Sequence, residues 1–183
     1  MSVSVQTATR VEIPRLQTER LVLRAPEPGD FDAYAAFFAS PRADLERGRM
    51  DRDGAWGAFA KAAATWIFDG YGAFSVAERE SGAYLGEVGM FREAHYPEAE
   101  LGWMLIAGAE GRGYAEEAAR AARLWAAERG IHRPVSYIHP ENHRSIRLAE
   151  RLGARPDPVA PLPVGWTAAT TLAYRHPGAG ARP

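Results

Sequence analysis

Hydrophobic positions change their spacing twice within the central third of the chain. Residues 101–106 form a short apolar run next to glycines, which is typical of a buried β-strand. Three glycines then crowd into one short loop: Gly108, Gly111 and Gly113. From Ala115 onward the apolar positions recur every three or four residues, which predicts an amphipathic helix. The pattern therefore predicts a strand, a glycine-rich loop and a helix over residues 100–126.

Further elements are predicted on both sides of this central unit. Strands are predicted at residues 18–24, 71–80, 84–92 and 134–139, with one or two more within 165–175. Helices are predicted at residues 31–39, 54–69 and 142–152, and the central helix should end near Gly130. Because a helix separates the central strand from the strand at 134–139, these two strands should run parallel. Residues 155–163 hold four prolines and should form an exposed loop, and residues 176–183 a tail.

Several positions carry more specific structural expectations. Asp30 and Asp53 are the predicted caps of the first two helices, because each directly precedes a helical pattern. Gly86 and Gly89 indicate a bulge or a close backbone approach within a strand. The second helix should bury an apolar stripe, formed by Trp56, Phe59, Ala60, Ala63, Trp66 and Ile67.

The start of the central helix is a candidate site for a phosphate or diphosphate. The first backbone N–H groups of a helix lack partners and carry partial positive charge. Gly111 and Gly113 would let a ligand approach this backbone, and Arg112 adds a cation beside it. Close packing of a helix on a sheet would require the same glycines, so both interpretations stay open for this stretch alone.

Two common nucleotide-binding motifs fit this loop poorly. A P-loop requires Lys-Ser or Lys-Thr after its glycines, and neither pair follows here. A dinucleotide-binding fingerprint requires a third glycine, but Glu116 stands at that position. A side chain there would obstruct the tight contact between helix and sheet.

Composition limits the class of protein. A chain of 183 residues fits one domain, which we expect to span residues 1–183 with flexible ends at 1–15 and 177–183. The formal net charge of −1 gives no indication of a nucleic-acid partner, and the absence of cysteine excludes disulfides and thiolate catalysis. No secretory signal and no membrane-length apolar stretch is visible, so we expect a cytoplasmic protein without a membrane partner.

Two motifs in the chain resemble those of the GNAT superfamily of amine N-acetyltransferases. The acetyl-CoA loop of that family, Gln/Arg-x-x-Gly-x-Gly/Ala, is similar to residues 110–115, although Glu110 departs at the first position. The second motif, Asn-x-x-Ser, resembles residues 142–145 and is followed by Leu-Gly at 152–153. The opening Thr-Glu-Arg-Leu at 18–21 resembles the subgroup that acetylates ribosomal-protein amino termini. The resemblance covers about residues 16–174.

This resemblance implies a fold and a coenzyme. It implies an α/β fold with a mixed, mainly antiparallel sheet, helices on both faces, and a central parallel pair of strands that splay apart. Acetyl-CoA would enter the gap as co-substrate. The residues implied to bind it are Met104, Leu105 and Ile106 through their backbone, the loop Gly111, Arg112, Gly113, Tyr114 and Ala115, and then Asn142 and Arg151.

The resemblance also implies which side chains take part in catalysis. Glu100, at the start of the central strand, is the candidate base that removes a proton from the acceptor amine, directly or through water. Glu87 and Glu98 are the alternatives. Ser145 would lie near the sulfur as an acid or as an anchor for water. Many relatives carry a tyrosine seven residues after the asparagine, where this chain has Ala149.

The sequence thus predicts transfer of an acetyl group from acetyl-CoA to a primary amine, held together in a ternary complex. A protein amino terminus and small-molecule amines both stay open as acceptors, and so does a homodimer. The alternatives are an inactive acyl-CoA-binding sensor and a nucleotide-binding module. No metal is expected, because Pro140 prevents His139 and His143 from sharing a helical face.

Overall fold

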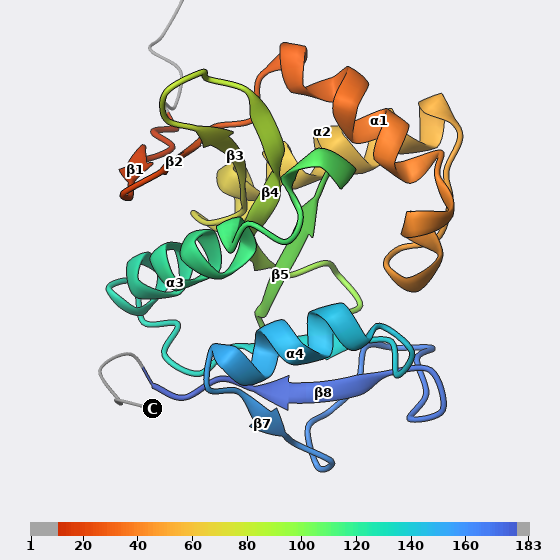
Figure 1. Cartoon of the computed structure of the whole chain (residues 1–183). Coiled ribbons are helices and arrows are strands. Elements are labelled where there is room, and N and C mark those ends of the chain that lie inside the picture. The colour runs from red at the N-terminus through yellow and green to blue at the C-terminus, as the bar shows by residue number, and fades with distance from the viewer. Residues whose placement is uncertain (1–10, 179–183) are drawn as a thin grey trace, which may run out of the picture.

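The computed structural model describes residues 11–178, so the expectations for residues 1–10 and 179–183 lie outside it. The described chain forms a sheet of eight strands in the order β1-β2-β3-β4-β5-β6-β8-β7 (Figure 1). Its strands are β1 (Leu16–Gln17), β2 (Leu21–Arg24), β3 (Ala73–Glu78), β4 (Tyr84–Phe91), β5 (Glu100–Leu105), β6 (Val135–Ile138), β7 (Arg155–Pro156) and β8 (Leu172–Arg175). Its α-helices are α1 (Phe31–Phe38), α2 (Arg52–Phe68), α3 (Tyr114–Ala127) and α4 (His143–Arg151).

Helices cover both faces of the sheet, as predicted (Figure 1). Side chains of successive residues in a strand point to opposite faces, and β5 shows this alternation. Leu101 belongs to the hydrophobic cluster beneath α3, whereas Met104 belongs to the cluster formed with α1 and α2. The central strand is therefore enclosed on both sides, which explains its nearly continuous apolar sequence.

Strands β5 and β6 form the one parallel pair of the described sheet, and every other neighbouring pair is antiparallel. Only Glu100 and Val135 are in register across this parallel pair. By contrast, β5 is paired with β4 along its whole length, from Glu100 to Leu105. The prediction of a mixed, mainly antiparallel sheet with a splayed central pair is confirmed.

One predicted helix cap is wrong, and the other has the predicted position without the capping hydrogen bond. Asp30 makes no capping bond to α1; its carboxylate binds the guanidinium of Arg24 and accepts a hydrogen bond from Ser75. Helix α2 begins one residue before Asp53, and its cap is Asp51, which accepts the N–H of Gly54 at 2.7 Å. Asp51 and Asp53 both have side chains that can cap a helix, so the sequence alone did not distinguish them.

The predicted buried stripe of α2 is also partly wrong. Trp56 and Ile67 are exposed, at 50% and 65% respectively. The buried face instead consists of Ala55, Ala58, Phe59, Ala62 and Trp66. Because alanines occur on every side of this helix, the hydrophobic pattern did not determine which side would pack against the sheet.

The predicted irregularity at Gly86 is confirmed. The register of β3 and β4 shifts here, because Val76 pairs with Gly86 and Ala77 pairs with Tyr84. Gly86 has a φ of 147°, and a Cβ atom at this position would lie 2.1 Å from the carbonyl oxygen of Met104. Only glycine permits this close approach of β4 to β5.

The carboxyl-terminal part confirms one expectation and differs from two others. Of the one or two strands predicted within residues 165–175, β8 is present. At the start of the predicted exposed loop, Arg155 and Pro156 form the short strand β7, which pairs with β8. His176 is no part of a tail, since its side chain is fully buried and its backbone N–H donates to Pro134 at 3.0 Å. No helix within residues 11–178 combines the length and apolar character needed to cross a membrane.

Candidate active site

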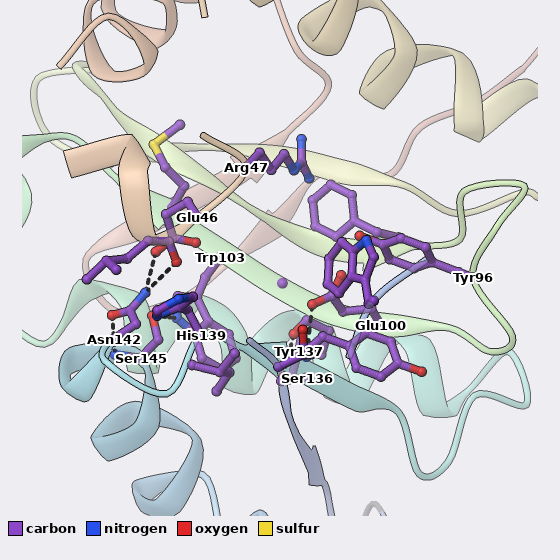
Figure 2. A pocket seen from close by; sticks show the side chains of 18 of the residues that line it. Glu46, Arg47, Tyr96, Glu100, Trp103, Ser136, Tyr137, His139, Asn142 and Ser145 are labelled. Atoms are coloured by element: carbon purple, nitrogen blue, oxygen red, sulfur yellow. Dashed lines mark hydrogen bonds between the residues drawn. The ribbon is translucent and has the colours of Figure 1, made fainter. Parts of the chain in front are cut away.

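Two cavities open beside β5. The first, of about 290 Å³, is lined by three carboxylates, Glu46, Glu87 and Glu100, and we call it the acidic cavity (Figure 2). The second, of about 510 Å³, is lined by the loop before α3 and the first turns of α4, and we call it the glycine-loop cavity. The residues that line both are Glu46, Trp103, Met104, Asn142 and Ser145. The two cavities therefore meet at the middle of β5.

Side chains replace backbone pairing at the point where β5 and β6 separate. The carboxylate of Glu100 accepts the backbone N–H of Tyr137 at 3.1 Å. The hydroxyl of Ser136 donates to the carbonyl oxygen of Leu101 at 2.6 Å. Backbone groups buried without a partner are costly, so these two bonds stabilise the splay that opens the acidic cavity.

Ser136 is held in turn by His176. The Nε2 atom of His176 lies 2.9 Å from the Ser136 hydroxyl oxygen. Because that hydroxyl gives its proton to Leu101, Nε2 must be the protonated nitrogen that donates. Burial lowers the pKa of His176 to about 3, with further lowering by Arg123 and Arg175, so the ring is neutral. We therefore assign this pair a structural role.

Glu100 has the properties of a proton acceptor at neutral pH. Burial raises the pKa of its carboxyl to about 7, against the lowering effects of the Tyr137 N–H, Arg47 and Tyr96. The carboxylate also lines the acidic cavity (Figure 2). A general base is most effective when its pKa lies near the working pH.

The alternative bases differ in position. Glu87 lines the acidic cavity but is 5% exposed, and burial raises its pKa while Arg47 opposes this shift. Glu98 lines neither cavity, and its carboxylate binds the guanidinium of Arg175, with one contact at 2.7 Å. Of the two alternatives, only Glu87 is brought to the site.

Ser145 lies at the junction of the two cavities. The indole N–H of Trp103 donates to its hydroxyl oxygen at 3.2 Å. This bond leaves the hydroxyl hydrogen of Ser145 available to donate to a group in the cavity.

Asn142 connects α4 to the loop that follows α1. Its side-chain oxygen accepts the N–H of Ser145 at 3.2 Å and so caps α4. Its amide nitrogen donates to the carbonyl oxygen of Leu45 at 3.3 Å and to the carboxylate of Glu46 at 2.9 Å. Both amide hydrogens are thus engaged, and a contact of Asn142 with a ligand stays a prediction.

The glycine loop presents backbone to its cavity. Gly111 and Gly113 have positive φ angles of 72° and 77°, and Gly113 directly precedes α3. Gly111, Gly113, Tyr114 and Ala115 line the cavity, as do Met104 and Leu105 of β5. Such a turn and helix start place N–H groups toward an anion.

Two residues predicted to bind the coenzyme do not line this cavity, namely Arg112 of the loop and Ile106, which follows β5. The guanidinium of Arg112 turns away to Glu78, at 3.3 Å, and lies over the ring of Tyr114. A side-chain contact from Arg112 to a bound anion would require it to leave these partners.

Arginines nevertheless surround the glycine-loop cavity. Glu110, the residue that departs from the family motif, binds Arg42 and also Arg144, at 2.9 Å. Arg151 lines the same cavity and pairs with Glu116 at 3.0 Å. Arg42 was not predicted from the sequence, because it lies in a charged, irregular stretch without periodicity. The cavity thus combines backbone donors with cations, which suits an elongated ligand bearing phosphates.

No group of three or more histidine, aspartate or glutamate side chains within residues 11–178 is arranged to hold a metal ion.

Comparison with known proteins agrees with this architecture. The family model described as the acetyltransferase (GNAT) domain matches residues 20–155. The crystal structure of an acetyltransferase from Agrobacterium tumefaciens is 42% identical, with a TM-score of 0.84 over 94% of this chain and 99% of that chain. A protein from Bordetella pertussis described as a GNAT-family acetyltransferase is 29% identical, with a TM-score of 0.71 over 90% of this chain and 99% of that chain.

A more distant structure shares the fold and contains ligands. Spermidine N-acetyltransferase from Vibrio cholerae, in complex with CoA and spermine, is 17% identical, with a TM-score of 0.64 over 86% of this chain and 94% of that chain. The family match spans the glycine loop, the splayed strands and the start of α4, which together build the two cavities. From these matches and this geometry we conclude that the chain belongs to the GNAT family of acetyltransferases.

Proposed function

We propose that this protein transfers an acetyl group from acetyl-CoA to a primary amine by direct attack within a ternary complex. The observation that supports this most is the meeting of two unlike cavities beside β5. One offers backbone donors and arginines for an anionic coenzyme, and the other offers Glu100 for an amine. Reactants held at such a junction need no covalent enzyme intermediate.

The residues of the glycine-loop cavity fit coenzyme A. Gly111 tolerates its positive φ, and a Cβ there would meet no atom within 4 Å, so the loop is open to a ligand. We assign the diphosphate to the backbone of residues 111–115 and the pantetheine arm to the backbone of residues 104–106. Asn142 and Arg151 are the side chains proposed to contact the coenzyme. The Vibrio cholerae enzyme with the same fold contains CoA, which supports this choice.

The side chains of this chain divide the proton transfers between them. Glu100 accepts a proton from the acceptor ammonium, directly or through water, and the amine nitrogen then attacks the thioester carbon. The carbon–sulfur bond breaks, and the second proton of the attacking nitrogen passes to the departing thiolate, relayed by the Ser145 hydroxyl or by water that Ser145 holds. Because the thiol has a pKa of ~8.5, protonation of the thiolate requires no strong acid. Backbone N–H groups of β5 stabilise the charge on the carbonyl oxygen.

Calorimetry followed by an acceptor screen tests this proposal. Acetyl-CoA should bind with heat, and ATP should not. A panel of primary amines should then release free thiol with at least one acceptor. Binding without thiol release from any amine would instead indicate a sensor of acyl-CoA. The cytoplasmic location and a single domain over residues 1–183 stay predictions from the sequence.

A further inference from the structure

A guanidinium lies among the carboxylates of the acidic cavity. Arg47 follows the short 3₁₀ helix Pro41–Leu45 and lines this cavity together with Glu100 and Tyr96 (Figure 2). Its side chain is 28% exposed, and its guanidinium carbon lies 4.8 Å from the ring centre of Phe91. Arg47 is therefore held in place by an aromatic face while its edge stays accessible from the cavity.

The neighbours of Arg47 leave much of its hydrogen-bonding capacity unused. Its ion pair with Glu87 spans 3.7 Å, which is longer than a hydrogen bond. The hydroxyl of Tyr34 is a further polar neighbour. A guanidinium carries five N–H donors in a planar fork that matches a carboxylate. An ion pair of 3.7 Å with Glu87 does not occupy that fork.

Two of the carboxyls that face Arg47, those of Glu46 and Glu100, are only partly ionised at neutral pH. Burial raises the pKa of both Glu46 and Glu100 to about 7 and also raises the pKa of Glu87. Tyr34 and Tyr96 have raised pKa values because of burial, so both are neutral. Burial lowers the pKa of Arg47, but the Coulombic effect of Glu87 and the groups around it more than offsets this, and Arg47 stays charged.

We infer that the acceptor is a primary amine that also carries a carboxylate, which Arg47 binds while Glu100 faces the amine. This inference rests on the proposed function and narrows it. Guanidinium and carboxylate form two parallel hydrogen bonds in the most favourable geometry. A polyamine would instead bring a second cation toward Arg47, which is unfavourable in an enclosed site.

The carboxylate of the acceptor is either the α-carboxylate of an amino acid or an acidic side chain near a peptide amino terminus. A matched pair of probes tests each alternative. Phenylalanine and phenethylamine differ only by the α-carboxylate, and their rings suit a cavity whose walls include Phe91 and Trp166. The dipeptide amides Ser-Asp-NH2 and Ser-Asn-NH2 differ by an acidic side chain near a peptide amino terminus. In at least one pair, the compound with the additional carboxylate should have a kcat/KM about tenfold or more above that of the compound without it.

Substitution of Arg47 tests whether this residue causes the preference. Arg47→Gln should bring the ratio within the preferred pair close to one, and Arg47→Lys should keep part of it. Arg49 is the matched control, because it lies in the same loop, lines neither cavity and pairs with Asp44 at 2.7 Å. Arg49→Gln should keep the full preference.

A binding measurement complements the kinetics and needs no variant. For the wild-type protein saturated with CoA, 3-phenylpropionate, which has the carboxylate but no amine, should raise the Tm, and propylbenzene at equal concentration should not. A wild-type protein that prefers phenethylamine, Ser-Asn-NH2 or spermidine would overturn this inference alone, as would a preference that survives in Arg47→Gln. Absence of thiol release with every amine would overturn the proposed function as well.

Discussion

Glu100 and Tyr137 are joined by a hydrogen bond of 3.1 Å between the Glu100 carboxylate and the Tyr137 backbone N–H, across the gap between β5 and β6. The same carboxylate that we assign as base therefore also satisfies a backbone donor exposed by the splay. This dual role determines which substitution is informative. Glutamine retains an oxygen that can accept the bond but cannot take a proton, whereas alanine would lose both functions.

Glu100→Gln should lower kcat by about 100-fold or more, because proton removal by a positioned base contributes on that order. The affinity for acetyl-CoA, measured by calorimetry, should change by less than about twofold. Glu98→Gln is the matched control, since Glu98 lies two residues earlier and lines neither cavity. If both variants kept wild-type turnover, Glu87 or a water molecule would have to replace Glu100 as the base.

The pH dependence of kcat/KM should report the raised pKa of Glu100, about 7. The base works only when ionised, so activity should rise about tenfold per pH unit below pH 7 and level off above it. The profile of Glu100→Gln should lack this step. An identical step in the variant would assign it to another group, of which Glu46, also with a pKa of about 7, is the nearest candidate.

The contribution of Glu100 to the free energy of unfolding should fall as pH rises, whereas activity should increase. Because burial raises the folded-state pKa of Glu100 to about 7, the folded protein binds this proton more tightly than the unfolded chain does. The resulting stabilisation is fully present below about pH 4.3 and is lost as pH rises through 7. Glu100→Gln should therefore be more stable than wild type at pH 8, by on the order of 2 kcal/mol, and nearly equal at about pH 4. Denaturant titrations at both pH values check this difference.

Glu110→Gln should strengthen coenzyme binding. Glu110 neutralises Arg42 and Arg144, which both line the glycine-loop cavity. Without this carboxylate the two cations would face the phosphates, and exposed ion pairs of this kind change affinity by about threefold to fivefold. The gain should shrink in 0.5 M salt, because screening weakens such interactions. Weaker binding of CoA by the variant would show instead that the ion pairs of Glu110 with Arg42 and Arg144 maintain the structure of the cavity.

Gly111→Ala should weaken coenzyme binding through the backbone. The φ of Gly111 is 72°, and a left-handed conformation costs a residue with a side chain about 1 kcal/mol. A Cβ here meets no atom within 4 Å, so crowding would not explain a loss. Gly108 is the matched control, because its Cβ is equally free and its φ is not positive. Equal affinities of the two alanine variants would contradict a role for the loop conformation.

Local patterns were sufficient to predict the order of the elements and the sense of strand pairing. The change from an apolar run to a helical period located β5 and α3. Because α3 connects β5 to β6, these two strands had to be parallel. Gly86 and Gly89 indicated a bulge or a close backbone approach, because glycine inside a strand often marks one. These features depend on neighbours in the sequence, which is why the sequence alone revealed them.

The features missed depend on contacts between distant segments. The bonds of Ser136 with Leu101 and His176 join residues far apart in the chain, and no periodicity indicates them. Arg47 lies in a charged stretch that has the composition of an ordinary exposed loop. The position of Arg47 in the acidic cavity follows only from the fold. Catalytic candidates were identified by motif, whereas the residues that shape the acceptor site were not.

The three hydrogen bonds of Asn142 have a consequence for how this enzyme can diversify. One amide side chain fixes the start of α4 and also the turn at Leu45 and Glu46, which immediately precedes Arg47. A change of acceptor that reshapes this turn would therefore disturb the helix that lines the glycine-loop cavity. Redesign of acceptor selectivity should leave residues 45 and 46 unchanged and vary other residues that line the acidic cavity.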